Sequence, residues 1–127
     1  MTPATRQRGS ATVEITIAAP LAIFLLLLVV QYAMWAHATH IAQAAANTGV
    51  QAARAHGGST TDGHADTHAM LDQLAGAVLT GTSVTVDITP TEATVTVTGT
   101  AMSVLPGIQL PVRATVTAPR EQIPGTP

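Results

Sequence analysis

The chain has 127 residues, with 9% charged and 2% aromatic residues and a formal net charge of −2. This length leaves room for one small domain beside a membrane segment, which excludes a large enzyme core. Its five basic residues are all arginines and do not cluster, which excludes the basic surface that nucleic acid needs. The absence of cysteine excludes disulfides and thiolate metal sites.

An uncharged apolar run extends from Ile15 to Ala36. As a helix rising about 1.5 Å per residue it is about 33 Å long, which matches a hydrocarbon core of about 30 Å. Arg6 and Arg8 precede it and the next basic residue is Arg54, so the positive-inside bias predicts a single pass of the plasma (inner) membrane, with a cytoplasmic N-terminus and an extracytoplasmic C-terminal part. Pro20 removes a backbone donor one turn into the run and predicts a helix kink.

A cleaved secretory signal is an alternative interpretation of the same run. Ala36-His37-Ala38 follows the small-x-small pattern of signal peptidase sites, and cleavage there would release a secreted domain that begins at Thr39. The apolar run is longer than the usual region of about 7 to 15 residues, and an anion stands at its head. Both features favour an uncleaved anchor.

That anion is Glu14, and burying a carboxylate in lipid costs several kcal/mol unless a cation or hydrogen-bond donors compensate. In one interpretation Glu14 stays at headgroup level and gains about 0.3 to 1 kcal/mol from the helix dipole. In the other it needs a specific partner. Gly9 stands five residues before Glu14, at the end of a short basic leader of residues 1–9.

This pattern resembles the class III signal of type IV pilins and pseudopilins, and residues 6–56 resemble the TadE-like family of the tight-adherence (Tad) pilus machinery. The resemblance implies that a prepilin peptidase cuts between Gly9 and Ser10, and that the new α-amine of Ser10 meets Glu14 of a neighbouring subunit. The implied partners are other pilin or pseudopilin subunits, the Tad assembly platform and membrane lipid. Ile15 stands where the major Flp pilins have tyrosine, which favours an accessory subunit.

The helical period continues beyond the membrane run to Gly57-Gly58, so we expect a transmembrane and extended helix over residues 10–57. Polar side chains form one stripe along its outer part. A second stripe of small residues would let another helix backbone approach closely, as a packed helical shaft requires. The alternative is a plain alanine-rich helix of high propensity. The small residues are Ala38, Ala42, Ala45, Gly49 and Ala52.

A small extracytoplasmic α+β domain is predicted over residues 58–118. After a loop over 59–63, the apolar spacing predicts a short helix over 65–79 that ends at Thr80-Gly81, and then a three-stranded antiparallel sheet packed on helix. Alternating apolar residues predict the strands 84–88, 93–98 and 112–118. The proline-rich tail, residues 119–127, is predicted to be disordered.

No motif in the chain predicts catalysis, so we expect neither an enzyme nor a cofactor. His64 and His68 are weak metal candidates, because a spacing of four places them on one helix face. The competing interpretation is a solvated helix start in which Asp62 or Asp66 favours the helix dipole, and nothing else supplies an obvious further ligand. Beside the Tad-type minor pilin, a permanently anchored envelope protein with a small binding domain remains a second hypothesis.

Overall fold

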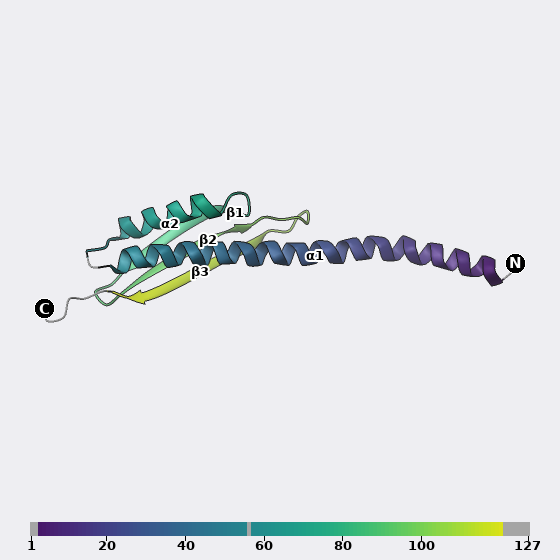
Figure 1. Ribbon diagram of the computed structural model, residues 1–127, viewed down its shortest axis with the longest axis horizontal. Helices are drawn as coiled ribbons and strands as arrows, with labels where there is room; N and C mark the ends of the chain where they lie inside the picture. The colour runs from purple at the N-terminus through teal and green to yellow at the C-terminus, as the bar shows by residue number, and fades with distance from the viewer. Residues whose placement is uncertain (1–2, 56, 121–127) are drawn as a thin grey trace.

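A computed structural model describes residues 3–55 and 57–120, and for residues 3–10 it gives only the course of the helix. Figure 1 shows a long helix whose C-terminal half lies beside a shorter helix and a sheet, while its N-terminal half extends away from them. This arrangement confirms the predicted α+β fold class. The elements are α1 (Pro3–Arg54), α2 (Thr60–Leu74), β1 (Leu79–Ile88), β2 (Glu92–Ala101) and β3 (Leu110–Pro119).

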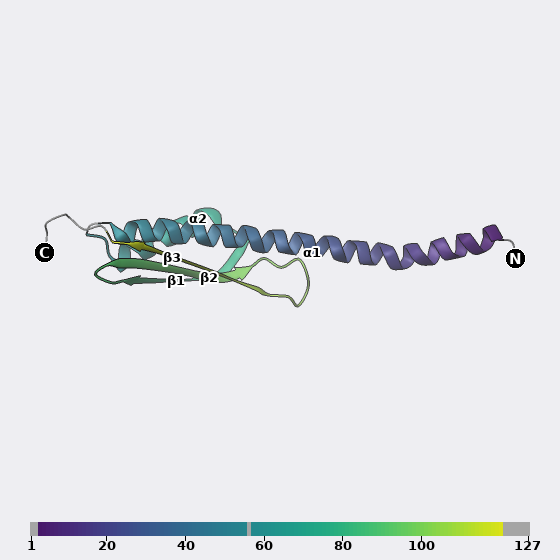
Figure 2. The ribbon, with the colours of Figure 1, turned by 90° about the horizontal axis from the view of Figure 1, so that it is seen from below.

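The three strands form one antiparallel sheet in the order β1-β2-β3, and Figure 2 shows both helices on the same face of it. In the central strand, Val95 pairs with Val86 of β1 and Val116 of β3, and Val95 is fully buried. Threonines alternate with these valines on the other face, where the hydroxyls of Thr94 and Thr117 lie 3.0 Å apart. The predicted alternation of buried and outward residues therefore holds.

The second helix begins and ends five residues before its predicted bounds of 65–79. Ser59 Oγ accepts a hydrogen bond of 3.2 Å from Asp62 N, and Asp62 Oδ2 accepts one of 3.1 Å from Ser59 N. This reciprocal capping box satisfies backbone donors at the helix start. The residues predicted as a loop, 59–63, are therefore the cap and first turn of α2.

The first strand begins at Leu79, within the segment predicted as helix, and Thr80-Gly81 does not end a helix as predicted. The pairing of β1 with β2 shifts between Thr80 and Ser83, where Gly81 has φ of +61°. A positive φ is accessible to glycine at no steric cost, so the strand continues through a bulge. The alternation of apolar residues becomes regular only beyond this bulge, from Val84 onward.

The core is built largely from small side chains. Val50, Val95, Val97 and Thr67 are the largest side chains that are fully buried among the described residues. One face of the C-terminal half of α1 packs against α2 and the sheet. Its buried hydrophobic residues are Ala38, Ile41, Ala42, Ala45, Ala46, Val50 and Ala53.

The C-terminal end of the sheet reaches further than predicted. Pro119 is the last residue of β3, and Arg120 N donates a hydrogen bond of 2.9 Å to the main-chain oxygen of Thr91. The predicted tail of residues 119–127 therefore begins no earlier than residue 121, and residues 121–127 lie outside the described part of the chain.

Candidate assembly surface

The N-terminal half of α1 presents a bare apolar surface. Every side chain from residue 11 to residue 30 is exposed except that of Leu27, which is half-buried, and Ile15 is 67% exposed. Among the described residues, α1 is the one helix with enough length and apolar composition to cross a bilayer, with a mean hydropathy of 2.6 in its most apolar window. An uncovered surface of this kind needs lipid or protein around it. The helix is compatible with a single-pass membrane anchor.

Glu14 stands on this bare part of α1, and its side chain is exposed between two exposed apolar neighbours, Val13 and Ile15. Gly9 and Ser10 belong to the same helix. Because an α-helix rises about 1.5 Å per residue, the backbone of Ser10 lies about 6 Å from that of Glu14 along the helix axis. This places Glu14 about one turn from the Gly9–Ser10 bond, at which the family resemblance implies cleavage.

Pro20 lies inside α1 without ending it. Proline has no N–H, so the carbonyl of Thr16 loses the donor that residue 20 would otherwise supply. The hydroxyl of Thr16 donates a hydrogen bond of 2.8 Å to the carbonyl of Thr12 one turn earlier. Figure 2 shows the N-terminal half of α1 curving gently. The predicted kink at Pro20 itself remains a prediction.

The chain's own α2 and sheet occupy the face of α1 that carries the small-residue stripe. Ala38, Ala42 and Ala45 are fully buried, Gly49 is buried and Ala52 is half-buried. These residues are covered by the same chain, whereas the sequence predicted only that another helix could approach this face. The opposite stripe is exposed to solvent at His37, His40, Gln43, Asn47 and Gln51.

Gly49 lies where α1 packs tightly against α2. A Cβ atom at this position would overlap Thr67 Oγ1 and would lie 3.0 Å from the carbonyl oxygen of Gly63. Thr67 Oγ1 donates a buried hydrogen bond of 2.6 Å to that same oxygen. The small-residue stripe does permit a close helix approach, and the approaching helix is α2 of the same chain.

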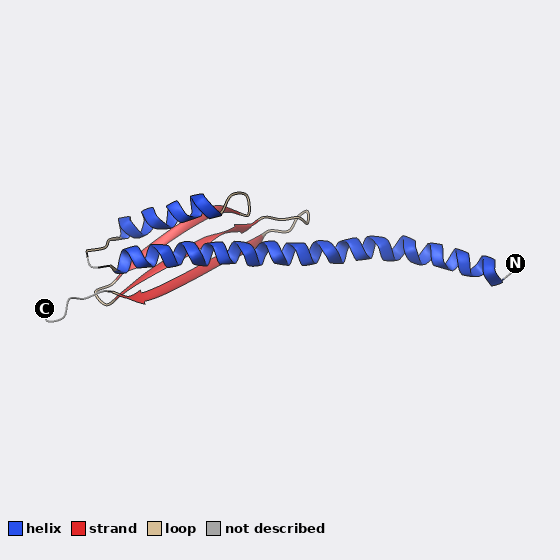
Figure 3. Ribbon diagram, in the orientation of Figure 1, coloured by secondary structure: helices blue, strands red, loops and turns tan. Residues whose placement is uncertain are grey.

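Gln31 fastens the loop between β2 and β3 to α1, a contact that sequence reasoning did not find. Its Nε2 donates a hydrogen bond of 3.1 Å to the carbonyl of Met102, and its Oε1 accepts one of 2.8 Å from Val104 N. The Gln31 side chain is only 4% exposed. Figure 3 shows this loop, residues 102–109, extending along α1 beyond the end of α2. A glutamine inside an apolar run signals that a partner exists, but its spacing in the sequence does not name that partner.

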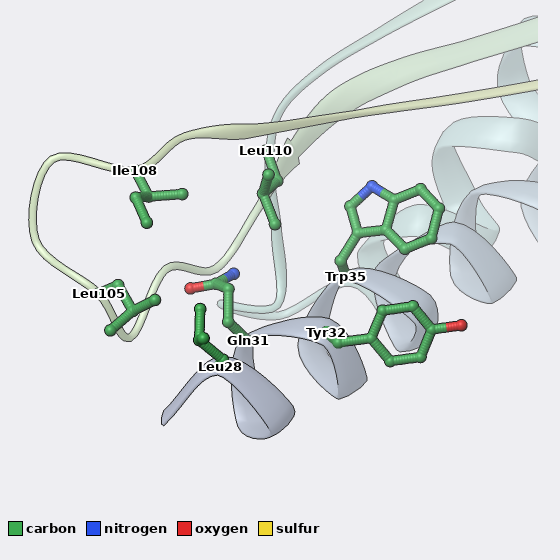
Figure 4. Close-up of a pocket in the computed structure, with 7 residues that line it drawn as sticks. All are labelled: Leu28, Gln31, Tyr32, Trp35, Leu105, Ile108 and Leu110. Atoms are coloured by element: carbon green, nitrogen blue, oxygen red, sulfur yellow. The ribbon is translucent and has the colours of Figure 1, made fainter. Parts of the chain in front are cut away.

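A pocket of about 350 Å³ opens between α1 and this loop. Figure 4 shows Leu105 and Ile108 of the loop facing Leu28 and Gln31 of the helix, with Tyr32 and Trp35 further along the helix. Trp35 Nε1 donates a hydrogen bond of 3.1 Å to the carbonyl of Pro111, which joins α1 directly to β3. The pocket is lined by Leu28, Gln31, Tyr32, Trp35, Leu105, Ile108 and Leu110.

His64 and His68 lie one turn apart on α2, with their ring centroids 5.9 Å apart in a stacked arrangement. The described residues contain no group of three or more histidine, aspartate or glutamate side chains placed to hold a metal ion. Two imidazoles supply half of a tetrahedral site at most. The two histidines lie on one helix face, as the sequence predicts, and by themselves they do not make a metal site.

Ala38, the end of the small-x-small pattern, lies in the middle of α1 and is fully buried in the core. A cut after Ala38 would remove Gln31 and Trp35, whose hydrogen bonds hold Met102, Val104 and Pro111. The folded domain therefore includes residues on the N-terminal side of that site. This arrangement counts against release of the domain by signal peptidase.

Residues 9–51 match the family model of the TadE-like proteins, which confirms the resemblance that the sequence carries. The matched segment begins at Gly9 and ends inside α1, so it covers the apolar helix and most of the helix that the domain packs on. The TadE-like family is a family of pilus-associated structural proteins and not of enzymes. Comparisons with curated proteins and with solved structures gave no match.

Proposed function

We propose that this TadE-like chain is a minor pilin or pseudopilin that takes part in assembling a Tad-type surface pilus for adhesion or transport. It is inserted in the inner membrane with its N-terminus in the cytoplasm and its domain outside. A prepilin peptidase removes residues 1–9 and leaves Ser10 as the new N-terminus. The chain then associates with other pilin or pseudopilin subunits and with the Tad assembly platform.

One observation carries the proposal: the rest of the chain leaves the apolar helix that follows Gly9 exposed from residue 11 to residue 30, apart from half-buried Leu27. A surface of this kind is stable in lipid and equally in the apolar centre of a helical filament. The buried residues of α1 begin at Gln31, beyond this stretch. The same helix is thus available first as an anchor and then as a packing element.

Glu14 supplies the charge that sets the register between subunits. In the apolar centre of a filament an isolated carboxylate is costly, and pairing it with a cation offsets that cost. Cleavage before Ser10 creates a cationic α-amine about one helical turn from Glu14 on each subunit. The amine of one subunit and the carboxylate of its neighbour then neutralise each other.

The intact mass of the chain, purified from cells with a working pilus system, tests this proposal. We expect the mass of a chain that starts at Ser10. A start at Met1 or Thr2 would instead indicate a permanently anchored envelope protein, and a start at Thr39 would indicate a secreted domain. The Gly9→Val variant is the matched control, because a bulkier residue before the cut should block processing and retain the leader.

A further inference from the structure

We propose that the loop between β2 and β3, residues 102–109, lies in the outer surface of the bilayer and contacts lipid acyl chains as a second membrane attachment. The inference rests on the membrane-anchored state in the proposed function. The helix is the first membrane attachment, and the loop would add a second one through the folded domain. The domain would then sit against the membrane before assembly, held by helix and loop together.

The length of the bare helix sets the level of the membrane surface. The side chains of residues 11–30 of α1 are exposed apart from half-buried Leu27, and at about 1.5 Å per residue these residues extend about 30 Å, which is the thickness of a hydrocarbon core. The loop approaches α1 at the pocket that Leu28 and Leu105 line, and from Gln31 onward hydrogen bonds join the domain to α1. The apolar run Ile15–Ala36 continues past Gln31. The last turns of this run and the loop that is hydrogen-bonded to them therefore lie at the same depth relative to the membrane surface.

The loop is held at this depth by hydrogen bonds that also satisfy its backbone. Gln31 bonds both the carbonyl of Met102 and the N–H of Val104. Ser103 Oγ donates a hydrogen bond of 2.6 Å to the carbonyl of Leu105. Irregular backbone is tolerated at membrane depth where protein groups satisfy it. The loop therefore brings fewer unpaired polar groups toward the lipid.

The side chains at this end of the sheet suit lipid and those at the other end suit water. Met102 is 42% and Ile108 is 38% exposed, and no charged residue occurs between Glu92 and Arg113. The β1–β2 turn, at the opposite end of β2, is flanked by exposed Asp87.

The apolar pocket lies between this loop and the apolar surface of α1. Tyr32 and Trp35 stand beside it with ring centroids 6.1 Å apart, and these two residue types prefer the membrane interface. The pocket continues the bare apolar surface of α1 at Leu28. An acyl chain lying along α1 would fill it without leaving the lipid phase.

A fluorescent label on the loop tests the inference. The chain has no cysteine, so Ile108→Cys in the full chain gives one attachment site for nitrobenzoxadiazole. The matched control is Thr91→Cys, an exposed position in the turn at the other end of the sheet. Each labelled chain is reconstituted in phosphatidylethanolamine and phosphatidylglycerol vesicles with nitroxide lipids. Trp35, the single tryptophan, reports the depth of α1 in the same sample.

We expect the label at position 108 to emit at shorter wavelength than the label at position 91. Nitroxides near the headgroup should quench both the label at 108 and Trp35. Aqueous iodide should quench the label at 108 less than the label at 91. Quenching of Trp35 alone, with the label at 108 as open to iodide as the label at 91, would overturn the inference and leave the anchor intact. Release of the chain by alkaline extraction would overturn both. Shielding at 108 that disappears as lipid is added in excess would assign the surface to a second copy of the chain and overturn the inference.

Discussion

Gln31 and Met102 lie 71 positions apart in the sequence, and the side-chain Nε2 of Gln31 donates a hydrogen bond of 3.1 Å to the carbonyl of Met102. The Oε1 of the same amide accepts from Val104 N, so both halves of one buried side chain are used. Few other side chains can do this, because the pair of bonds needs a donor and an acceptor at a fixed separation.

The Gln31→Leu variant should free the β2–β3 loop from α1. It leaves the Val104 N–H and the Met102 carbonyl without this partner, at a cost of about 1 to 3 kcal/mol in the free energy of unfolding. Hydrogen exchange at the Val104 amide, measured in detergent micelles, should become faster. Gln43→Leu is the matched control, since Gln43 lies exposed on the same helix. Unchanged exchange in Gln31→Leu would contradict the role of this bond.

The Gly49→Ala variant should push α2 away from α1. The added Cβ would overlap Thr67 Oγ1, and overpacking of this kind costs about 1 to 3 kcal/mol. Denaturant unfolding of the two single variants and of Gly49→Ala/Thr67→Ala gives a double-mutant cycle. Because Thr67→Ala removes the overlapping atom, the double variant should lose less stability than the sum of the two single losses. Simple additivity would show that the two residues do not meet.

The Ser59→Ala variant should loosen the start of α2. It removes the oxygen that accepts from Asp62 N, and the loss of a helix cap costs about 0.5 to 2 kcal/mol. Thermal unfolding gives the loss in stability, and amide exchange at Asp62 localises it. Ser83→Ala on β1, where the side chain is exposed, should change neither quantity.

The Glu14→Ala variant should enter the membrane normally and fail to enter the pilus. Removing the carboxylate lowers the cost of membrane insertion but leaves the α-amine of the neighbouring subunit without its counter-charge. Alkaline extraction measures insertion, and immunoblotting of sheared surface fibres measures incorporation. Glu92→Ala, which alters an exposed glutamate at the start of β2, is the control that should assemble. Normal incorporation of Glu14→Ala would refute the pairing mechanism.

The spacing of apolar residues predicted the helices and strands of this fold. The predicted bounds were wrong where a helix cap or a glycine bulge changes the local backbone. The alternation around Val95 and Val97 predicted the central strand because one face of the sheet is buried. The start of α2 was misplaced because serine, threonine and glycine suggested a loop, whereas Ser59 and Asp62 act as a capping box. The glycine bulge at Gly81 likewise hid the first part of β1.

Contacts between segments that are distant in the sequence could not be predicted from the spacing of residues. The stripe containing Gly49 predicted a close helix contact but not that Thr67 of the same chain makes it. The apolar run that contains Gln31 predicted a membrane helix but not the loop that its amide holds. Both partners are fixed by the path of the chain after Gly57, and that path depends on packing rather than on spacing.

Because α1 continues without interruption from its exposed half into the core, the exposed half and the sheet are connected rigidly. Advancing the helix by one residue along its axis, about 1.5 Å, carries the whole sheet by the same amount. A pulling force on the exposed half of α1 reaches the β2–β3 loop through the hydrogen bonds of Gln31 and reaches β3 through that of Trp35. A force along the axis of the exposed half of α1 therefore moves the domain directly, because no flexible segment separates the two.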